Sequence, residues 1–206
     1  MAAKPDSTSE AREQLLATAA RVMRDNDTID VSLSELSRQS GLNSALVKYY
    51  FGNKAGLMQA LLEREMSAVL QALEDTFAIE RDPATRLRAH IGGVIDKFFE
   101  VPFIQRLLMH MIEESPPHDA QRLADLYLKP VYAAYDRMIA DGVEAGLFRP
   151  VDSRFFFFTL TGAVDRFFAA RMFMRYCFGE DSLSEDLRDR FRDHTVDFIM
   201  AGILKD

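Results

Sequence analysis

Residues 31–54 indicate the fold of this chain most clearly, and they read VSLSELSRQSGLNSALVKYYFGNK. Ser32 or Ser34 can cap a first short helix, because a side-chain oxygen at that position accepts a free backbone N–H. Gly41 follows this helix at a point where a tight turn needs a residue that tolerates positive φ. A second apolar-periodic stretch then begins. This spacing is typical of a helix-turn-helix.

The second helix of the motif has two different faces. Asn43 or Ser44 can cap its start. Its back is expected to be buried by Leu46, Val47 and Phe51. Its outward face consists of Ser44, Ala45, Lys48 and Tyr49. Residues at this spacing share one helical surface, so these side chains can reach base edges or phosphates in a major groove.

Charge is distributed unevenly along the 206 residues. The formal net charge is −7, which for the chain as a whole argues against a nucleic-acid-binding protein. Residues 1–60 nevertheless sum to zero, and residues 36–62 contain Arg38, Lys48 and Lys54 but no acid. Lys54 also stands near the start of the next helix, whose free amides favour a phosphate. We therefore expect a DNA contact confined to one end of the protein.

The rest of the chain is predicted to be all-α, with about nine helices and short connections. No segment alternates with period two, and the hydrophobic fraction of 48% supplies a core. Pro130 predicts a kink in a helix over 119–145. A helix is expected over 153–173 and a last one over 184–204. The domain boundaries predicted are a disordered tail (1–9), a helix-turn-helix domain (10–57) and a helical sensing and dimerisation domain (58–206).

Residues 31–57 resemble the DNA-binding region of TetR-like (tetracycline-repressor-like) transcriptional regulators. The residues that carry the match are Ser32, Leu36, Gly41, Leu42, Val47, Tyr50, Phe51, Lys54 and Leu57. The resemblance implies a three-helix DNA-binding domain, a larger helical ligand-sensing domain and a homodimer. It further implies a transcriptional repressor that binds a palindromic operator in double-stranded DNA and is released by a small, largely apolar effector.

The same resemblance assigns roles to individual residues. It places Ser44, Ala45 and Lys48 facing bases, and Tyr49, Tyr50 and Lys54 on the DNA backbone. Three features depart from the family pattern. Asn26-Asp27 stands where a glycine is usual after the first helix, Lys48 stands where tyrosine is common, and Gly56 is unusual so early in a helix. Lys48 is expected to change the operator preference.

Most of the 16 Phe and 10 Met lie after residue 57, which predicts a large core, a dimer interface and a possible ligand site. The dimer is expected to form through residues 152–173 and 184–204. The resemblance implies that these two helices of each copy form a four-helix bundle. The candidate effector-binding residues are Phe99, Phe103, Met111, Tyr132, Tyr135 and Phe168. Aromatic and methionine side chains suit an apolar or aromatic ligand.

Several classes of function are not indicated. No phosphate-binding loop, nucleophile elbow or His/Cys cluster is visible, so we expect no enzyme, no metal and no cofactor. A single cysteine, Cys177, and the lack of a long apolar run predict a cytoplasmic protein that does not span a membrane. Two alternatives stay open: a helical small-molecule-binding protein or enzyme with a vestigial helix-turn-helix, and a protein-interaction module.

Overall fold

A computed structural model describes residues 7–79 and 82–205, and it confirms the all-α prediction. The part of the chain so described forms ten separate helical stretches and no β-strand, against about nine helices predicted. The first five helices are α1 (Ser7–Asn26), α2 (Leu33–Ser40), α3 (Ala45–Phe51), α4 (Lys54–Ala78) and α5 (Pro83–Glu100). The others are α6 (Ile104–Glu113), α7 (Pro117–Leu123), η1 (Ala124–Leu128), α8 (Lys129–Glu144), α9 (Ser153–Ala169), α10 (Arg171–Phe178) and α11 (Glu185–Ile203). Most of the predicted tail lies outside the described residues.

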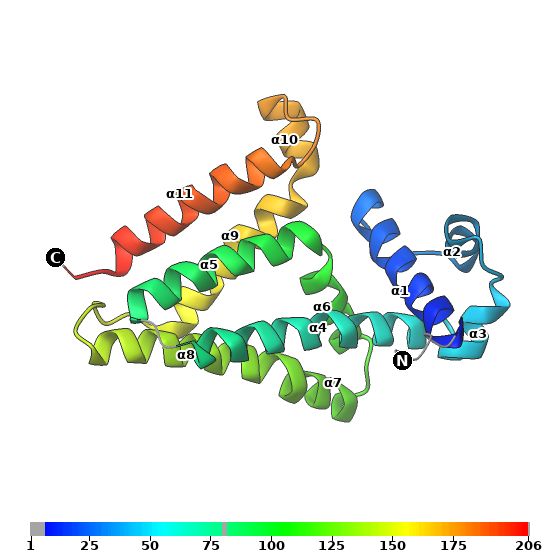
Figure 1. The fold of residues 1–206 in the computed structure, drawn as a ribbon, viewed down its shortest axis with the longest axis horizontal. Coiled ribbons are helices and arrows are strands. Elements are labelled where there is room, and N and C mark those ends of the chain that lie inside the picture. The colour runs from blue at the N-terminus through cyan, green and yellow to red at the C-terminus, as the bar shows by residue number, and fades with distance from the viewer. Residues whose placement is uncertain (1–6, 80–81, 206) are drawn as a thin grey trace, which may run out of the picture. The chain divides into compact units, whose positions relative to one another are not determined.

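The chain divides into two compact units (Figure 1). The first unit comprises the chain up to Ser67 together with Phe103–Glu114, and therefore holds α1, α2, α3, the first part of α4, and α6. The second unit comprises Ala68–Pro102 and Ser115–Asp206. A helix from the middle of the sequence thus belongs to the unit that carries the helix-turn-helix.

The core of the first unit is built by the apolar faces of α1 and α4. Leu15, Leu16 and Met23 on α1 and Leu57 and Leu61 on α4 are essentially inaccessible to solvent. Burying a leucine side chain stabilises the fold by about 2 kcal/mol. The two short helices of the motif, α2 and α3, belong to the same compact unit as this core.

The end of α1 is closed by Asp27 and by an arginine from α6. Asp27 has a φ of 49°, a left-handed conformation, and follows the last residue of α1. Arg106 donates hydrogen bonds to the Asp27 carboxylate at 2.5 Å and to its carbonyl oxygen at 3.2 Å. These bonds hold a backbone conformation that is uncommon for a residue other than glycine. They also tie α6 to α1 within the first unit.

In the second unit, α5 packs against α8, α9 and α11 (Figure 1). Leu87, Ile91 and Ile95 on α5 are fully buried at this packing. The turn after α8 adds Phe148, whose ring is fully buried and lies directly on Gly142. A Cβ at Gly142 would overlap this ring, so the missing side chain makes room for it.

The predicted kink at Pro130 takes the form of a π-helical turn. Segment η1 joins α7 to α8, and Lys129 donates its N–H to the carbonyl of Ala124, five residues earlier. Pro130 has no N–H to donate and would clash with the carbonyl one turn earlier in a regular helix. A π-helical turn is one of the known ways in which a helix accommodates such an interruption.

The helix predicted over 153–173 is wrong at its C-terminal end. Helix α9 ends at Ala169, Ala170 leaves the helical conformation, and α10 continues to Phe178. No glycine, proline or capping side chain marks this break, because residues 165–178 read DRFFAARMFMRYCF. The break puts Met174 into the core while Met172 and Phe173 stay exposed. Asp152 caps α9, and Ser184 caps α11.

Candidate DNA-binding surface and effector site

The first helix of the motif is fixed at both ends by short polar side chains. Ser32 Oγ accepts the N–H of Glu35 at 3.1 Å, which identifies Ser32 and not Ser34 as the cap. Gly41 ends the helix with a φ of 70°, the left-handed conformation expected there. In the turn, Ser37 donates to the carbonyl of Leu42 at 2.6 Å, and Ser40 accepts the N–H of Leu42 at 3.1 Å. Both serines therefore fasten the turn.

The second helix of the motif is capped by Asn43, whose Oδ1 accepts the N–H of Ala45 at 2.8 Å. The hydroxyl of Ser44 makes no capping bond, so it stays available to a partner outside the protein. Val47 is fully buried, whereas Leu46 and Phe51 are half-buried. The three residues predicted to be buried are therefore all shielded from solvent at least in part, although only Val47 is fully buried.

The predicted outward face is exposed in full. Ser44, Ala45, Lys48 and Tyr49 are all accessible to solvent, and Tyr49 exposes 74% of its surface. We call these four residues the recognition face. Tyr50 is half-buried, and its ring meets that of Tyr49 edge to face with centroids 4.9 Å apart. Tyr50 therefore supports Tyr49 and leaves part of its own surface open.

Two of the three cations of the acid-free segment are already paired. Lys54 donates to the carboxylate of Asp30, and this bond lowers the pKa of Asp30. Arg38 pairs with Glu35 at 2.6 Å, which lowers the pKa of Glu35. Lys48 has no acidic partner within 4 Å among the described residues. Of the three positive charges in residues 36–62, the charge of Lys48 is therefore the one that no acidic side chain in the described part of the chain neutralises.

Gly56 lets the last turn of α3 pass over the first turn of α4. A Cβ at this position would overlap the carbonyl oxygen of Phe51 and lie 3.1 Å from the carbonyl carbon. Asn53 closes the same corner, since its Oδ1 accepts the N–H of Gly56 at 2.9 Å. The glycine that looked unusual in the sequence is thus required by a close approach between two backbones.

The candidate effector-binding residues do not form one cluster. Tyr132 and Tyr135 both meet Phe157, with centroid distances of 6.2 and 5.0 Å. In a separate contact, Phe99 meets Phe168 at 6.0 Å. Phe168 and Tyr135 are buried, whereas Phe99 and Tyr132 are half-buried. The remaining two candidates, fully buried Phe103 and half-buried Met111, belong to the first unit.

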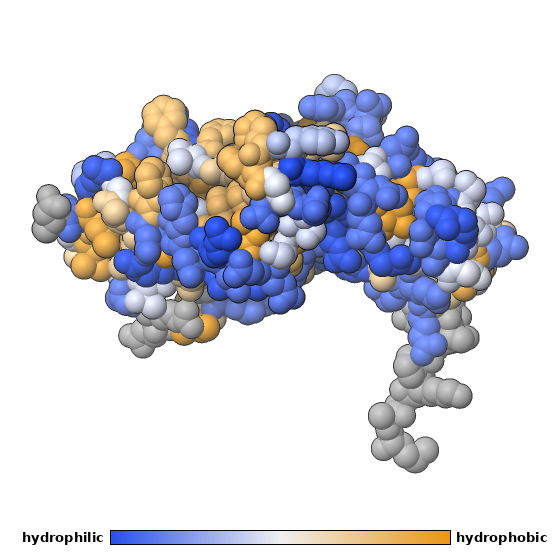
Figure 2. Space-filling view, turned by 90° about the horizontal axis from the view of Figure 1, so that it is seen from above, coloured by the Kyte–Doolittle hydropathy of each residue, from blue (hydrophilic) through white to orange (hydrophobic). Residues whose placement is uncertain are grey.

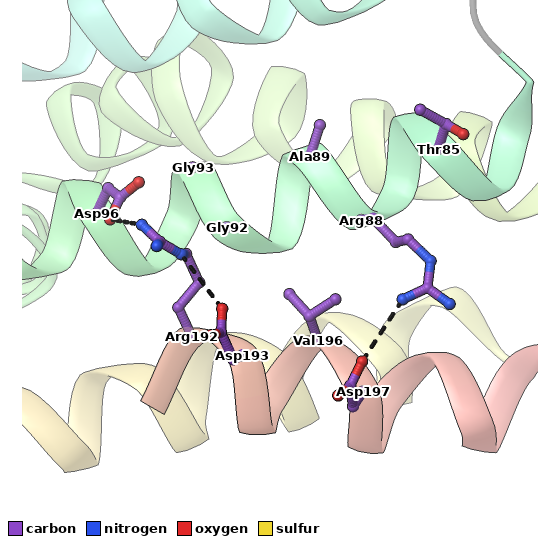
Figure 3. Close-up of a pocket in the computed structure, with 10 residues that line it drawn as sticks. All are labelled: Thr85, Arg88, Ala89, Gly92, Gly93, Asp96, Arg192, Asp193, Val196 and Asp197. Carbon is purple, nitrogen blue, oxygen red and sulfur yellow. Dashed lines mark hydrogen bonds and ion pairs between the residues drawn. The ribbon is translucent and has the colours of Figure 1, made fainter. Parts of the chain in front are cut away.

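A groove of about 620 Å³ lies between α5 and α11, and none of the candidate effector residues lines it (Figure 3). Its floor is made of small residues that include Ala89, Gly92 and Gly93. Arg192 reaches across from α11 to Asp96 at 3.2 Å, and Arg88 reaches Asp197 at 3.7 Å. These charges satisfy one another across the groove.

Large apolar side chains are exposed on the last three helices of the second unit. Phe155 and Phe158 on α9 expose 72% and 69% of their surfaces, and Phe198 on α11 exposes 70%. On α10 the exposed side chains are Met172, Phe173, Tyr176 and Phe178. Figure 2 shows apolar side chains gathered over part of the second unit. Patches of this kind on a folded protein mark interaction surfaces.

Within residues 7–79 and 82–205, no group of three or more His, Cys, Asp or Glu side chains is placed to hold a metal ion. No described helix is both long enough and apolar enough to cross a membrane.

A capped helix-turn-helix with an exposed recognition face, on a larger all-helical chain, defines a DNA-binding regulator of transcription. The family is shown by two sequence models. The model of bacterial regulatory proteins of the tetR family matches residues 15–61, and the tetracyclin repressor-like C-terminal domain matches residues 80–206. This chain therefore belongs to the TetR family of transcriptional regulators.

Known relatives agree with this assignment. The regulator BetI of Stenotrophomonas maltophilia is 30% identical over 90 residues, which cover 41% of this chain and 44% of BetI. A transcriptional regulator from Saccharomonospora viridis, solved with choline, has 19% identity and a TM-score of 0.68 over 96% of this chain and 100% of its own. FadR of Bacillus subtilis, solved with stearoyl-CoA, has 16% identity and a TM-score of 0.65 over 92% and 98%. At these identities the structures establish a common fold.

Proposed function

We propose that this protein is a homodimeric, ligand-responsive repressor that binds a palindromic operator. The observation that carries the proposal is the recognition face, four adjacent exposed side chains on a helix whose cap, back and turn are all fixed. Two such helices, one from each copy, would enter successive major grooves when they lie about 34–36 Å apart. A two-fold dimer implies a palindromic site.

Each side chain has a task in this proposal. Ser44, Ala45 and Lys48 read base edges, because they are exposed on one side of α3. Tyr49, Tyr50 and Lys54 contact the DNA backbone. Lys54 is paired with Asp30 in the free protein and exchanges this partner for a phosphate on binding. Since the ion pair is solvent-exposed, breaking it costs little. The phosphate contact also gains from counterion release.

Replacing Lys54 with alanine should weaken operator binding and lower the slope of log K against log salt concentration by about one unit. The operator is first selected from random double-stranded DNA by the wild-type protein. Binding is then measured by fluorescence anisotropy at several salt concentrations. Lys129→Ala, a matched change on α8 of the second unit, should leave the slope unchanged. An unchanged slope for Lys54→Ala would remove Lys54 from the DNA contact.

The exposed apolar residues of α9 and α11 form the dimer interface in this proposal. Phe155, Phe158 and Phe198 are the large apolar side chains of these helices that are most exposed to solvent. Gly162 and Ala163, which are also exposed on α9, allow the backbones of two copies to come close. Aromatic enrichment of this kind is typical of protein interfaces.

Replacing Phe158 with glutamate should separate the two copies, since an unpaired carboxylate buried in the interface costs several kcal/mol. We expect wild-type protein to sediment as a dimer at micromolar concentration and Phe158→Glu to sediment as a 23.4 kDa monomer. The control is Leu126→Glu, an exposed apolar position on η1 that should leave the dimer intact. A wild-type monomer, or a dimeric Phe158→Glu variant, would contradict this interface.

The effector in this proposal is a small, largely apolar molecule held among the aromatic side chains of the second unit. Structural neighbours solved with choline and with stearoyl-CoA show that this fold accommodates organic ligands. The effector acts by binding more tightly to conformations whose recognition helices have the wrong spacing. The hydrogen bonds between Arg106 and Asp27 connect α6 directly to the end of α1. We infer that this connection transmits part of the change in recognition-helix spacing.

A further inference from the structure

His90 on α5 is a buried polar side chain with one unsatisfied nitrogen. It exposes 7% of its surface. Its Nε2 atom has no hydrogen-bond partner among the described residues. Its ring meets the ring of Tyr135 edge to face, with centroids 4.7 Å apart. An unpaired polar atom in a protein interior is destabilising, so such atoms are rare and each one needs an explanation.

The surroundings of His90 are aromatic. Tyr135 also meets Phe156 and Phe157, with centroid distances of 6.2 and 5.0 Å. Tyr132 meets the other side of this group through Phe157, and its hydroxyl is 2.9 Å from Ser153 Oγ. Ser153 donates onward to Asp136 at 2.6 Å. Tyr132, Ser153 and Asp136 therefore satisfy one another, whereas His90 Nε2 has no partner among the described residues.

The helix that carries Tyr132 and Tyr135 also contains the π-helical turn. Residues 117–144 form one continuous helical run, and η1 ends four residues before Tyr132. Such turns are frequent at functional sites, and one extra residue is accommodated in the helix there. A change of pairing at η1 would shift or rotate the residues after it. The aromatic cluster on one side of His90 therefore follows an irregular turn of its own helix.

We propose that His90 is the polar anchor of the effector site, and that the effector is an uncharged, mainly aromatic molecule with one hydroxyl or carbonyl group. This inference rests on the proposed function of the second unit as an effector-binding body. A neutral imidazole can donate or accept one hydrogen bond at Nε2. Burial lowers the pKa of His90 to about 4, so the ring is neutral at pH 7.

A charged effector fits this site less well. Transfer of an ionised group into an apolar site is costly unless an opposite charge meets it there. On α5, Arg86 stands four residues before His90 and is already paired with Asp141 at 2.8 Å. A hydroxyl or carbonyl group needs only the hydrogen bond that Nε2 leaves open.

The proposal is tested with 2-naphthol, naphthalene and 2-naphthoate, which share one ring system and carry a hydroxyl, no polar group and a carboxylate. Binding to the full-length protein without DNA is measured by calorimetry, and the imidazole signals are followed by NMR. We expect 2-naphthol to bind about tenfold more tightly than naphthalene, as one hydrogen bond permits, and more tightly than 2-naphthoate. It should also shift the His90 imidazole signals.

The variant His90→Phe distinguishes a ligand-binding role of His90 from a purely structural role. The variant should bind 2-naphthol and naphthalene equally, and its Tm should rise by about 3 °C because an unsatisfied polar group is replaced by an apolar ring. His118→Phe, at an exposed position, should change neither property. The proposal is overturned if no probe moves the His90 signals at millimolar concentration, if the hydroxyl preference survives in His90→Phe, or if this variant is less stable. None of these measurements involves DNA, so failure of operator binding is a separate result.

Discussion

A Gly56→Ala variant should lose operator affinity by at least 100-fold while its second unit stays folded. The added Cβ overlaps the carbonyl oxygen of Phe51, a backbone atom that no rotamer change can move. Relieving the overlap requires α3 to move away from the start of α4, and α3 carries the recognition face. A steric mutation against the backbone falls at the upper end of the usual range, about 3 kcal/mol, and a loss of binding free energy of this size is a factor of roughly 100.

The measurement combines operator titration with thermal unfolding. The matched control is Gly93→Ala on α5, where an added Cβ meets nothing within 4 Å. Alanine is favoured over glycine inside a helix by about 1 kcal/mol, so this control should keep full operator affinity and gain slight stability. If Gly56→Ala bound the operator as tightly as Gly93→Ala, the close approach of the two backbones would not matter for DNA binding.

The helix-turn-helix was predictable because its signals are local. Capping at Ser32, the left-handed turn at Gly41 and the burial of Val47 each follow from residues only a few positions apart. The sequence does not distinguish Asn43 from Ser44 as the second cap, because both side chains can accept the same kind of bond. The structure selects Asn43, which leaves the Ser44 hydroxyl to the recognition face.

Features that depend on distant parts of the chain were not predictable. Arg106 reaches Asp27 across 79 positions, and Lys54 reaches Asp30 across 24. The sequence marked Gly56 as unusual, but its reason is the carbonyl of Phe51 in the preceding helix. Periodicity shows which face of a helix is apolar and does not show which element meets it.

The sequence was also unable to locate the effector site among the aromatic residues. Large aromatic side chains are so frequent in this body that composition could not separate a binding wall from a core. Tyr132 and Tyr135 were named from the sequence, and they do lie in one aromatic group. His90 was not named, since a single histidine in an apolar stripe carries no signal until its partners are known. The unsatisfied Nε2 atom supplies that signal.

His90 should also make the stability of the protein depend on pH in a window where few other groups titrate. Burial lowers its pKa in the folded state to about 4, whereas the unfolded chain has the ordinary value of 6.5. The unfolded state therefore binds a proton more readily as the pH falls below 6.5. The stability that the neutral ring provides is full above pH 6.5 and is lost as the pH falls towards 4. This loss amounts to about 2 kcal/mol between pH 7 and pH 5 and about 3 kcal/mol by pH 4.

Urea unfolding of the wild-type protein and of His90→Phe, measured at pH 7, 6 and 5, tests this expectation. The wild-type free energy of unfolding should fall over this range by about 2 kcal/mol more than that of the variant. The carboxylates with a lowered pKa, such as Asp82 and Asp152, weaken the fold only at lower pH, because their ordinary pKa is 3.8. Parallel curves for the two proteins would mean that the folded protein holds His90 with an ordinary pKa. The imidazole would then be solvated, and the dry aromatic surroundings that favour an uncharged effector would be absent.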